Sequence, residues 1–295
     1  MERDMKTSVV SVAWKWFWRV GLLLIQSPFR WVYDFGYRVF FKIVSPHTEI
    51  KFLNYGYVCL SEQDEKSLGS LERALDKVPK KERLCARLYA KTVSMLPNFE
   101  TRLKGAEVVE VGCGHGGGLE WLSGALPQIK SMRGMDMVLP KGGEEGGKMF
   151  QGNAMDMPME DGSLDVLINV ESSHCYSDQS KFFQECFRVL KPGGHLVTSD
   201  FRPAGLHSDN YLMDPHKAGL QKVAVEDISQ GVAKAMEEGF CDMSEALRRN
   251  RLLRWTSFFW DHLWTRGIQH DLEEKEFFFW AAAWQKPLQP LSKRG

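Results

Sequence analysis

Short apolar segments alternate with amphipathic segments along the second half of the chain. Residues 178–190 carry apolar side chains at helical spacing, Phe183 and Phe187 among them, so a helix is predicted there. The sequence Lys-Pro-Gly-Gly at 191–194 predicts a turn. This alternation is typical of a parallel sheet. The predicted strands cover about 107–112, 131–137, 148–152, 164–170 and 195–200.

The segments on either side of this region have different patterns. A last apolar strand is predicted at 277–284, and a Lys-Pro pair ends it at 286–287. Residues 201–254 look helical. Upstream, a helix is predicted to end near Met95, and it would form a lid or an entrance to a site.

The N-terminal segment, residues 8–44, is rich in aromatic side chains with Lys and Arg between them. Its uncharged run at 20–29 is too short to span a bilayer, which needs roughly 20 apolar residues. No small-residue cleavage site follows, so a signal peptide is also a poor match. The pattern favours a helical arm in a membrane interface, broken at Pro28. The alternatives are an arm packed on the domain and a dimer contact.

Composition narrows the class of protein. The 38 Lys and Arg balance the 38 Asp and Glu, so nothing in the overall charge indicates a nucleic acid partner. The six cysteines are scattered without a C-x-x-C pair, which favours a reduced, intracellular protein and predicts no metal site. Together with the N-terminal arm, the cysteine pattern predicts an intracellular protein. It would associate with a membrane as a peripheral or monotopic protein that faces the cytoplasm. The oligomeric state is left open.

A glycine-rich loop follows the first predicted strand. The sequence VVEVGCGHGGG at 108–118 predicts a buried strand, a loop with few side chains and then a helix. In such a loop the backbone approaches a ligand closely, and the N-terminus of the helix faces it.

Two ligands fit this loop. Its glycines satisfy G-x-G-x-x-G, which permits a dinucleotide. Glu110 stands just before the first glycine, where a carboxylate would repel a pyrophosphate but attract the ammonium and sulfonium of S-adenosylmethionine. The methyl donor is therefore favoured, with a glycine-rich turn that binds nothing as the third interpretation.

Polar residues recur where the predicted strands end. In an open α/β sheet, ligands bind at this edge, beyond the carboxyl ends of the strands. The residues found there are Glu110, Asp136, Asn153, Glu171, His174 and Asp200.

These motifs together resemble class I S-adenosylmethionine-dependent methyltransferases, and most closely the phthiotriolone and phenolphthiotriolone dimycocerosates methyltransferase group. The resemblance runs from about residue 47 to 285. It implies an α/β, Rossmann-like seven-stranded sheet with helices on both faces and a reversed final strand. The expected division is an arm at 1–45, a helical lid or entrance segment at 46–100 and a methyltransferase domain at 101–290. The motifs that carry the resemblance are EVGCGHGGG, GMD, GNAMDMP, DVLINVESSHCY and FRVLKPGGHLVTSD.

The resemblance also implies a set of residues that bind the methyl donor. Asp136 corresponds to the acid that holds the ribose hydroxyls, and Tyr57 to an aromatic residue that covers the donor. The family usually has Asp where Asn153 stands, beside the adenine. The full set is Tyr57, Glu110, Gly112, Gly114, Gly116, Asp136, Asn153, Ala154, Asn169 and Glu171.

One departure concerns the segment after Asp136. Relatives fit a full helix there, whereas this chain has the glycine-rich sequence KGGEEGG, which is unfavourable for a helix. We expect a thinner wall on the adenine side and a weaker hold on the donor.

His174 is the candidate base of the reaction. A hydroxyl acceptor has to lose a proton, and an imidazole titrates near neutral pH. Asp200 lies one helix and one strand further on, at the same edge of the sheet, where it would orient His174. The alternative is that both residues only cap their loops.

The predicted activity is O-methylation of a hydroxyl on a hydrophobic lipid or polyketide-like molecule, at a membrane surface reached through residues 8–44. The alternatives are C-methylation of a sterol or quinone, N-methylation, and binding of the donor without catalysis. A nicotinamide-dependent oxidoreductase would need a catalytic Tyr/Lys or similar set that is not evident.

Overall fold

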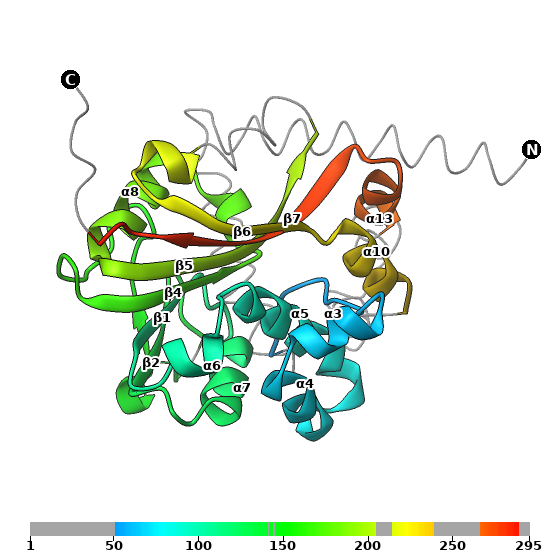
Figure 1. The fold of residues 1–295 in the computed structure, drawn as a ribbon, viewed down its shortest axis with the longest axis horizontal. Coiled ribbons are helices and arrows are strands. Elements are labelled where there is room, and N and C mark those ends of the chain that lie inside the picture. The colour runs from blue at the N-terminus through cyan, green and yellow to red at the C-terminus, as the bar shows by residue number, and fades with distance from the viewer. Residues whose placement is uncertain (1–50, 141, 144, 205–213, 239–265, 289–295) are drawn as a thin grey trace, which may run out of the picture.

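A seven-stranded mixed sheet forms the centre of the computed structural model, which describes residues 51–140, 142–143, 145–204, 214–238 and 266–288 (Figure 1). The predicted arm at 1–45 lies outside these residues. The strand order is β3-β2-β1-β4-β5-β7-β6. The strands are β1 (Glu107–Val111), β2 (Ser131–Asp136), β3 (Met149–Gln151), β4 (Leu164–Val170), β5 (Leu190–Pro203), β6 (Gln221–Asp227) and β7 (Phe277–Gln285).

The direction of the strands confirms the predicted Rossmann-like sheet with a reversed final strand. The strands β1 to β5 pair in parallel with their neighbours, whereas β7 is antiparallel to both β5 and β6. Parallel strands bring their carboxyl ends to one edge of the sheet. The residues that follow β1, β2 and β4 therefore meet there.

Two predictions about the second half of the chain are wrong. Residues 221–227 form strand β6 rather than a helix; this edge strand is mostly exposed, so its sequence lacks a clear apolar face. The turn predicted at 191–194 lies inside β5, between Leu190, which pairs with Leu164, and His195, which pairs with Val166. Gly193 has a φ of +83° there, so the chain bulges and then resumes the strand.

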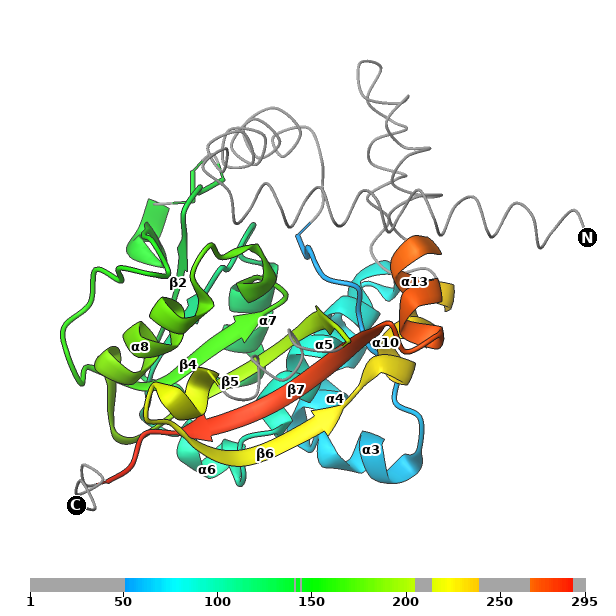
Figure 2. The same ribbon diagram turned by 90° about the horizontal axis from the view of Figure 1, so that it is seen from above.

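Helices cover both faces of the sheet (Figure 2). Helix α8 packs on one face through Phe182, Phe183 and Cys186, while α5 contributes Cys85 and Leu88 to the core of the other. The helices are α3 (Glu62–Ser67), α4 (Ser70–Ala74), α5 (Lys80–Ser94), α6 (Phe99–Arg102), α7 (Gly117–Ala125), α8 (Gln179–Val189), α10 (Ser229–Glu238) and α13 (Arg266–Glu273), with 3₁₀ turns at Leu75–Lys77, Glu145–Gly147 and Ser173–Cys175.

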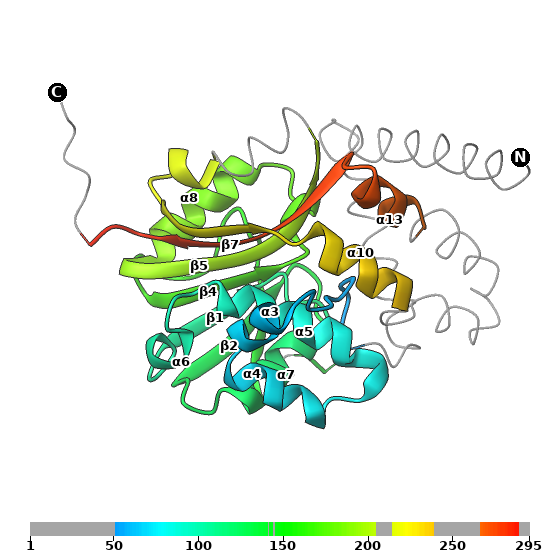
Figure 3. The same cartoon turned by 45° about the vertical axis from the view of Figure 1, so that its right-hand side comes forward.

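Helix α5 is the predicted helix that ends near Met95, and buried polar contacts attach it to the rest of the chain. The ammonium of Lys91 lies 2.7 Å from both Asp64 and Glu226, and the Thr92 hydroxyl donates to Ser199 Oγ at 2.7 Å. Figure 3 shows α10 beside α3 and α5. Within the described part of the chain, no helix has the length and apolar character needed to cross a membrane.

Candidate active site

The glycine loop between β1 and α7 follows a path that requires glycine. Residues 112, 114 and 116 have φ values of +77°, +54° and +80°, which residues other than glycine rarely adopt. A Cβ atom on Gly112 would lie 2.2 Å from Ser172 Oγ, so the loop also lacks room for a side chain there. The bare backbone thus forms a cradle at the carboxyl end of β1.

Glu110 is fully buried beneath this cradle, and only one of its carboxyl oxygens has a partner. The Tyr89 hydroxyl donates to Oε1 at 2.6 Å, whereas Oε2 has no hydrogen-bond partner among the described residues. Burial raises the pKa of Glu110 to about 8, with the bond from Tyr89 opposing the shift and Asp136 adding to it. A cationic group would satisfy this oxygen and restore the carboxylate.

Asp136 ends β2 opposite the same loop. Its carboxyl oxygens accept from Gly114 N–H at 2.9 Å and Val138 N–H at 3.1 Å, and each keeps capacity for a further donor. Burial raises the pKa of Asp136, and these backbone N–H groups oppose the shift. Asn153 and Ala154 follow Gly152, whose N–H donates to the Asp136 carbonyl at 2.9 Å. Both residues therefore lie at this end of β2.

Asn169 joins the end of β4 to the end of β1. Its Nδ2 donates to the Val111 carbonyl at 2.8 Å and to Ser172 Oγ at 2.7 Å. The Tyr176 hydroxyl lies 2.8 Å from Ser172 Oγ and would lie 3.0 Å from a Cβ on Gly112. Ser172 and Tyr176 close the cradle from the β4 side. Sequence reasoning missed both, although they belong to the motif that contains His174.

Tyr57 is not brought to the other predicted donor-binding residues. Its hydroxyl donates to Asp64 at 2.5 Å, and its ring lies against Gly231 of α10. The chain upstream of it approaches the cradle instead. A Cβ on Gly114 would lie 3.1 Å from Leu53, and one on Gly117 would lie 2.5 Å from the Lys51 carbonyl. The segment 51–55 thus approaches the cradle, while the side chain of Tyr57 is buried against α10.

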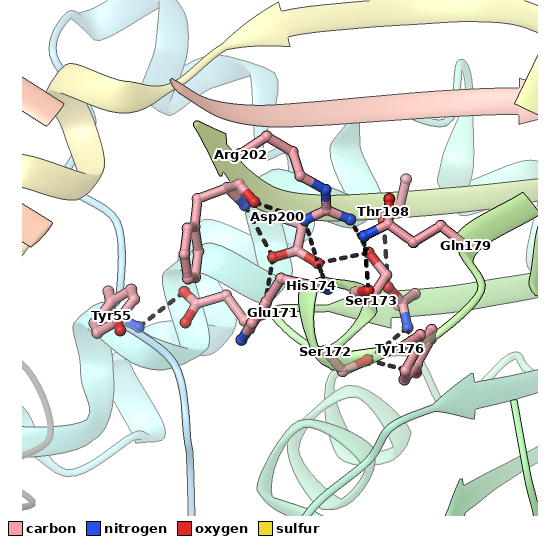
Figure 4. A network of polar contacts seen from close by, with 12 residues as sticks. Tyr55, Glu171, Ser172, Ser173, His174, Tyr176, Gln179, Thr198, Asp200 and Arg202 are labelled. Atoms are coloured by element: carbon pink, nitrogen blue, oxygen red, sulfur yellow. Dashed lines mark hydrogen bonds and ion pairs between the residues drawn. The ribbon is translucent and has the colours of Figure 1, made fainter. Parts of the chain in front are cut away.

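Glu171 lies beside a second polar cluster, with Tyr55 on its other side (Figure 4). Its φ of +45° is a strained value for a residue other than glycine, and its N–H donates to the Ser199 carbonyl at 2.8 Å. Its carboxyl Oε1 accepts from Tyr55 N–H at 2.9 Å. Burial raises the pKa of Glu171 well above the usual range, Asp200 adds to this and His174 opposes it. Its charge is therefore coupled to the His174 pair.

His174 and Asp200 are in direct contact, as the sequence predicted from their positions. The imidazole Nδ1 lies 2.8 Å from Asp200 Oδ1, and the backbone N–H of His174 donates to Oδ2 at 2.9 Å. The His174 ring also packs on Phe201, with 4.5 Å between ring centroids. Asp200 engages Nδ1, and the side chain of Cys175 also hydrogen-bonds to the imidazole. Nε2 is the ring nitrogen that Asp200 leaves for proton transfer.

The charge of Asp200 affects His174 strongly. Asp200 is fully buried, and His174 and Arg202 lower its pKa against the effect of burial. Although burial lowers the pKa of His174, Cys175 and Asp200 raise it well above the usual 6.5. These two neighbours therefore favour the imidazolium, and His174 accepts a proton only in its neutral form, above its raised pKa.

Two further residues complete this cluster and were missed from the sequence. Ser173 Oγ donates to Asp200 Oδ2 at 2.5 Å, and Arg202 Nη1 lies 3.2 Å from the same oxygen. Arg202 Nη2 also donates to Ser173 Oγ at 2.9 Å. The signal available was the alternation along β5, which puts residue 202 on the same face as residue 200.

The described residues hold no group of three or more His, Cys, Asp or Glu side chains arranged to bind a metal ion. What they do hold is a glycine cradle with acids at the ends of β1 and β2, at the carboxyl edge of a seven-stranded sheet whose final strand is reversed. This combination of fold and site defines the class of S-adenosylmethionine-dependent methyltransferases.

Comparison with known proteins agrees with this class. Residues 109–198 match the methyltransferase domain family. The phthiotriol/phenolphthiotriol dimycocerosates methyltransferase of Mycobacterium leprae is 32% identical over 195 residues, covering 64% of this chain and 67% of that protein. The fatty-acid O-methyltransferase of Mycolicibacterium smegmatis is 30% identical over 199 residues, covering 63% of this chain and 64% of that protein.

A solved structure shares the fold. Geranyl diphosphate methyltransferase in complex with S-adenosylmethionine superposes with a TM-score of 0.53 at 17% identity, covering 80% of this chain and 99% of that one. The chain belongs to the S-adenosylmethionine-dependent methyltransferases, and S-adenosylmethionine is its methyl donor. The cradle fits this donor, because the unpartnered Oε2 of Glu110 suits its ammonium and Asp136 retains capacity for hydroxyl groups.

Proposed function

We propose that this methyltransferase methylates a hydroxyl group on a hydrophobic lipid or polyketide-like molecule, with His174 as the general base. The observation that carries the proposal is the contact of 2.8 Å between His174 Nδ1 and Asp200, which orients the imidazole at the carboxyl edge of the sheet. Two relatives are named for lipid-like acceptors, phthiotriol dimycocerosates and fatty acids, and this supports a lipid-like acceptor here.

The donor-binding part of the proposal uses the cradle. Glu110 would accept from the donor's ammonium and Asp136 from its ribose hydroxyls, with Asn153 and Ala154 beside the adenine. Asn169 and Glu171 would stand at the methionine end, near the reacting methyl group. The glycines at 112, 114 and 116 would let the backbone approach the donor closely.

The proton follows a defined path in this proposal. His174 would take the proton from the acceptor hydroxyl, so that the acceptor oxygen can receive a methyl group. When bound, S-adenosylmethionine supplies the electrophilic methyl group. Asp200 stabilises the imidazolium that forms, and Phe201 holds the ring in place.

We also propose that the protein works at a membrane surface facing the cytoplasm. The aromatic and basic composition of residues 8–44 supports this, because such segments bind the interface between lipid and water. A hydrophobic acceptor dissolved in the membrane would then be within reach of the site.

Replacement of His174 tests the base. His174→Gln should lower the methyl-transfer rate at least about 100-fold while donor affinity, measured by isothermal titration calorimetry, stays unchanged. His216→Gln, at an exposed histidine, is the matched control and should keep full activity. Only the unprotonated imidazole accepts a proton, so wild-type activity should be lost as pH falls through the raised pKa of His174. Retained turnover in His174→Gln would refute the base role.

A second candidate function, C-methylation, is favoured by one observation. Glu171, Tyr55 and Phe201 place a carboxyl group and two aromatic rings beside His174, and such groups stabilise a cation that forms on a carbon acceptor. The position of a trideuteromethyl label in the product separates the two reactions. A label on oxygen supports the first proposal, and a label on carbon supports the second.

A further inference from the structure

Arg202 is a buried charge that contacts the cluster around Asp200. Only 4% of its surface is exposed. The guanidinium donates to the Phe201 carbonyl at 2.6 Å and to Ser173 Oγ at 2.9 Å, and it lies 3.2 Å from Asp200 Oδ2. Figure 4 shows it on the side of Asp200 away from Glu171.

The two oxygens of Asp200 therefore serve different partners. Oδ1 faces the imidazole of His174, while Oδ2 accepts from Ser173 Oγ and faces Arg202. One carboxylate thus stands between two cationic groups. Opposite charges this close interact strongly where water is excluded. The positive charge of Arg202 therefore offsets part of the attraction between Asp200 and the imidazolium of His174.

We infer that Arg202 is a positioning residue that compensates the charge of Asp200, so that His174 is held in place yet remains able to release its proton. Without this compensation, the full charge of Asp200 would hold the imidazolium. The catalytic part of this inference rests on the proposed role of His174 as base, whereas the effect on its charge does not.

Four charged or titratable groups of the described chain lie around His174. Asp200 and Arg202 lie on β5, Glu171 follows β4, and Cys175 is the next residue along. Among these four, Arg202 is the cation. Removal of Arg202 would leave Asp200, Glu171 and Cys175, which favour a protonated imidazole.

The direct test is a titration of His174 by NMR in protein with labelled histidine. Arg202→Gln should raise the pKa of His174 by about 1, because it removes the positive charge that offsets Asp200, the counter-ion of His174. Arg202→Lys, which keeps the charge, should restore most of the wild-type value. Arg188→Gln removes a guanidinium from α8, outside this cluster, and should leave His174 unchanged.

A second variant keeps the inference testable where Arg202→Gln is poorly folded. Ser173→Ala removes the hydroxyl that donates to Asp200, so it should shift the pKa of His174 in the same direction by a smaller amount. S-adenosylhomocysteine added during purification should stabilise either variant by mass action. An unchanged or lowered pKa of His174 in both variants would overturn the inference.

Activity distinguishes this inference from the proposed function. If His174 is the base, the pH–rate profile of Arg202→Gln should move to higher pH by the same amount, and its rate at a pH below the wild-type midpoint should fall about tenfold. A shifted NMR titration with an unshifted rate profile supports the compensation by Arg202 and refutes the base role.

Discussion

At the scale of single residues, the site depends on buried acids whose partners differ. Asp200 has an imidazole and a guanidinium beside it, which stabilise its charge. Glu110 accepts one hydrogen bond, from the Tyr89 hydroxyl, and its other carboxyl oxygen has no hydrogen-bond partner among the described residues. A negative charge on it is therefore unfavourable until a ligand binds. The same carboxyl chemistry therefore gives one acid whose charge is stabilised within the protein and one whose ionisation we propose to depend on the donor.

We predict that donor binding at pH 7 releases about one proton, because Glu110 has a raised pKa of about 8 and ionises beside the bound ammonium. Calorimetry in two buffers of different ionisation enthalpy measures this release. Glu110→Gln should abolish it and weaken binding. Glu107→Gln, in the same strand but with its carboxylate paired to exposed Lys130, should retain it. Release that persists in Glu110→Gln would assign the proton to another group.

A glycine substitution tests the cradle. Gly112→Ala should lower the free energy of unfolding by about 1–3 kcal/mol, because its φ is +77° and the new Cβ would lie 2.2 Å from Ser172 Oγ. Gly124→Ala is the control in α7, where nothing lies within 4 Å of the added atom; it should stabilise by about 0.5 kcal/mol. Chemical denaturation measures both, and equal stability of Gly112→Ala and wild type would contradict the predicted strain.

At the scale of elements, α5 connects the sheet to the segment that approaches the cradle. Lys91 pairs with Asp64, at the start of α3, and with Glu226 on β6, while Tyr89 of the same helix reaches Glu110. One helix therefore contacts the site on its inner side and fixes neighbouring elements by charge. The packing of α5 should affect both stability and donor binding.

Lys91→Met should lower the free energy of unfolding by about 2 kcal/mol, because it leaves the partly buried Asp64 carboxylate without its cation. Lys66→Met breaks the exposed pair with Glu62 and should change stability by less than about 0.5 kcal/mol. The midpoint of urea unfolding measures both variants. An equally small effect of Lys91→Met would show that its two ion pairs do not stabilise the fold.

At the scale of the whole molecule, the order of strands brings the two clusters to one edge. Strand β1 lies between β2 and β4, and β4 pairs with β5, so the cradle and the His174 cluster sit at adjacent strand ends. Asn169 bridges them through Val111 and Ser172. A donor in the cradle and an acceptor near His174 would thus meet over the end of β4.

Deletion of residues 1–44 tests the proposed membrane surface. The truncated protein should move from the membrane fraction to the supernatant after cell fractionation, because the aromatic and basic segment is removed. Its donor affinity should stay unchanged, since Glu110, Asp136 and the glycines of the cradle all lie in the retained chain. An unchanged distribution between fractions would refute the anchor.

The sequence by itself determined the sheet, the glycine loop and the acids at the strand ends, because these follow from local periodicity and from backbone that only glycine adopts. The contact of His174 with Asp200 was also predictable, since parallel strands return the chain to the same edge. Tertiary structure decided the remainder. It turned Tyr57 toward α10, brought segment 51–55 to the cradle and placed Arg202 against Asp200. Those contacts depend on side-chain packing between distant segments, which local pattern does not encode.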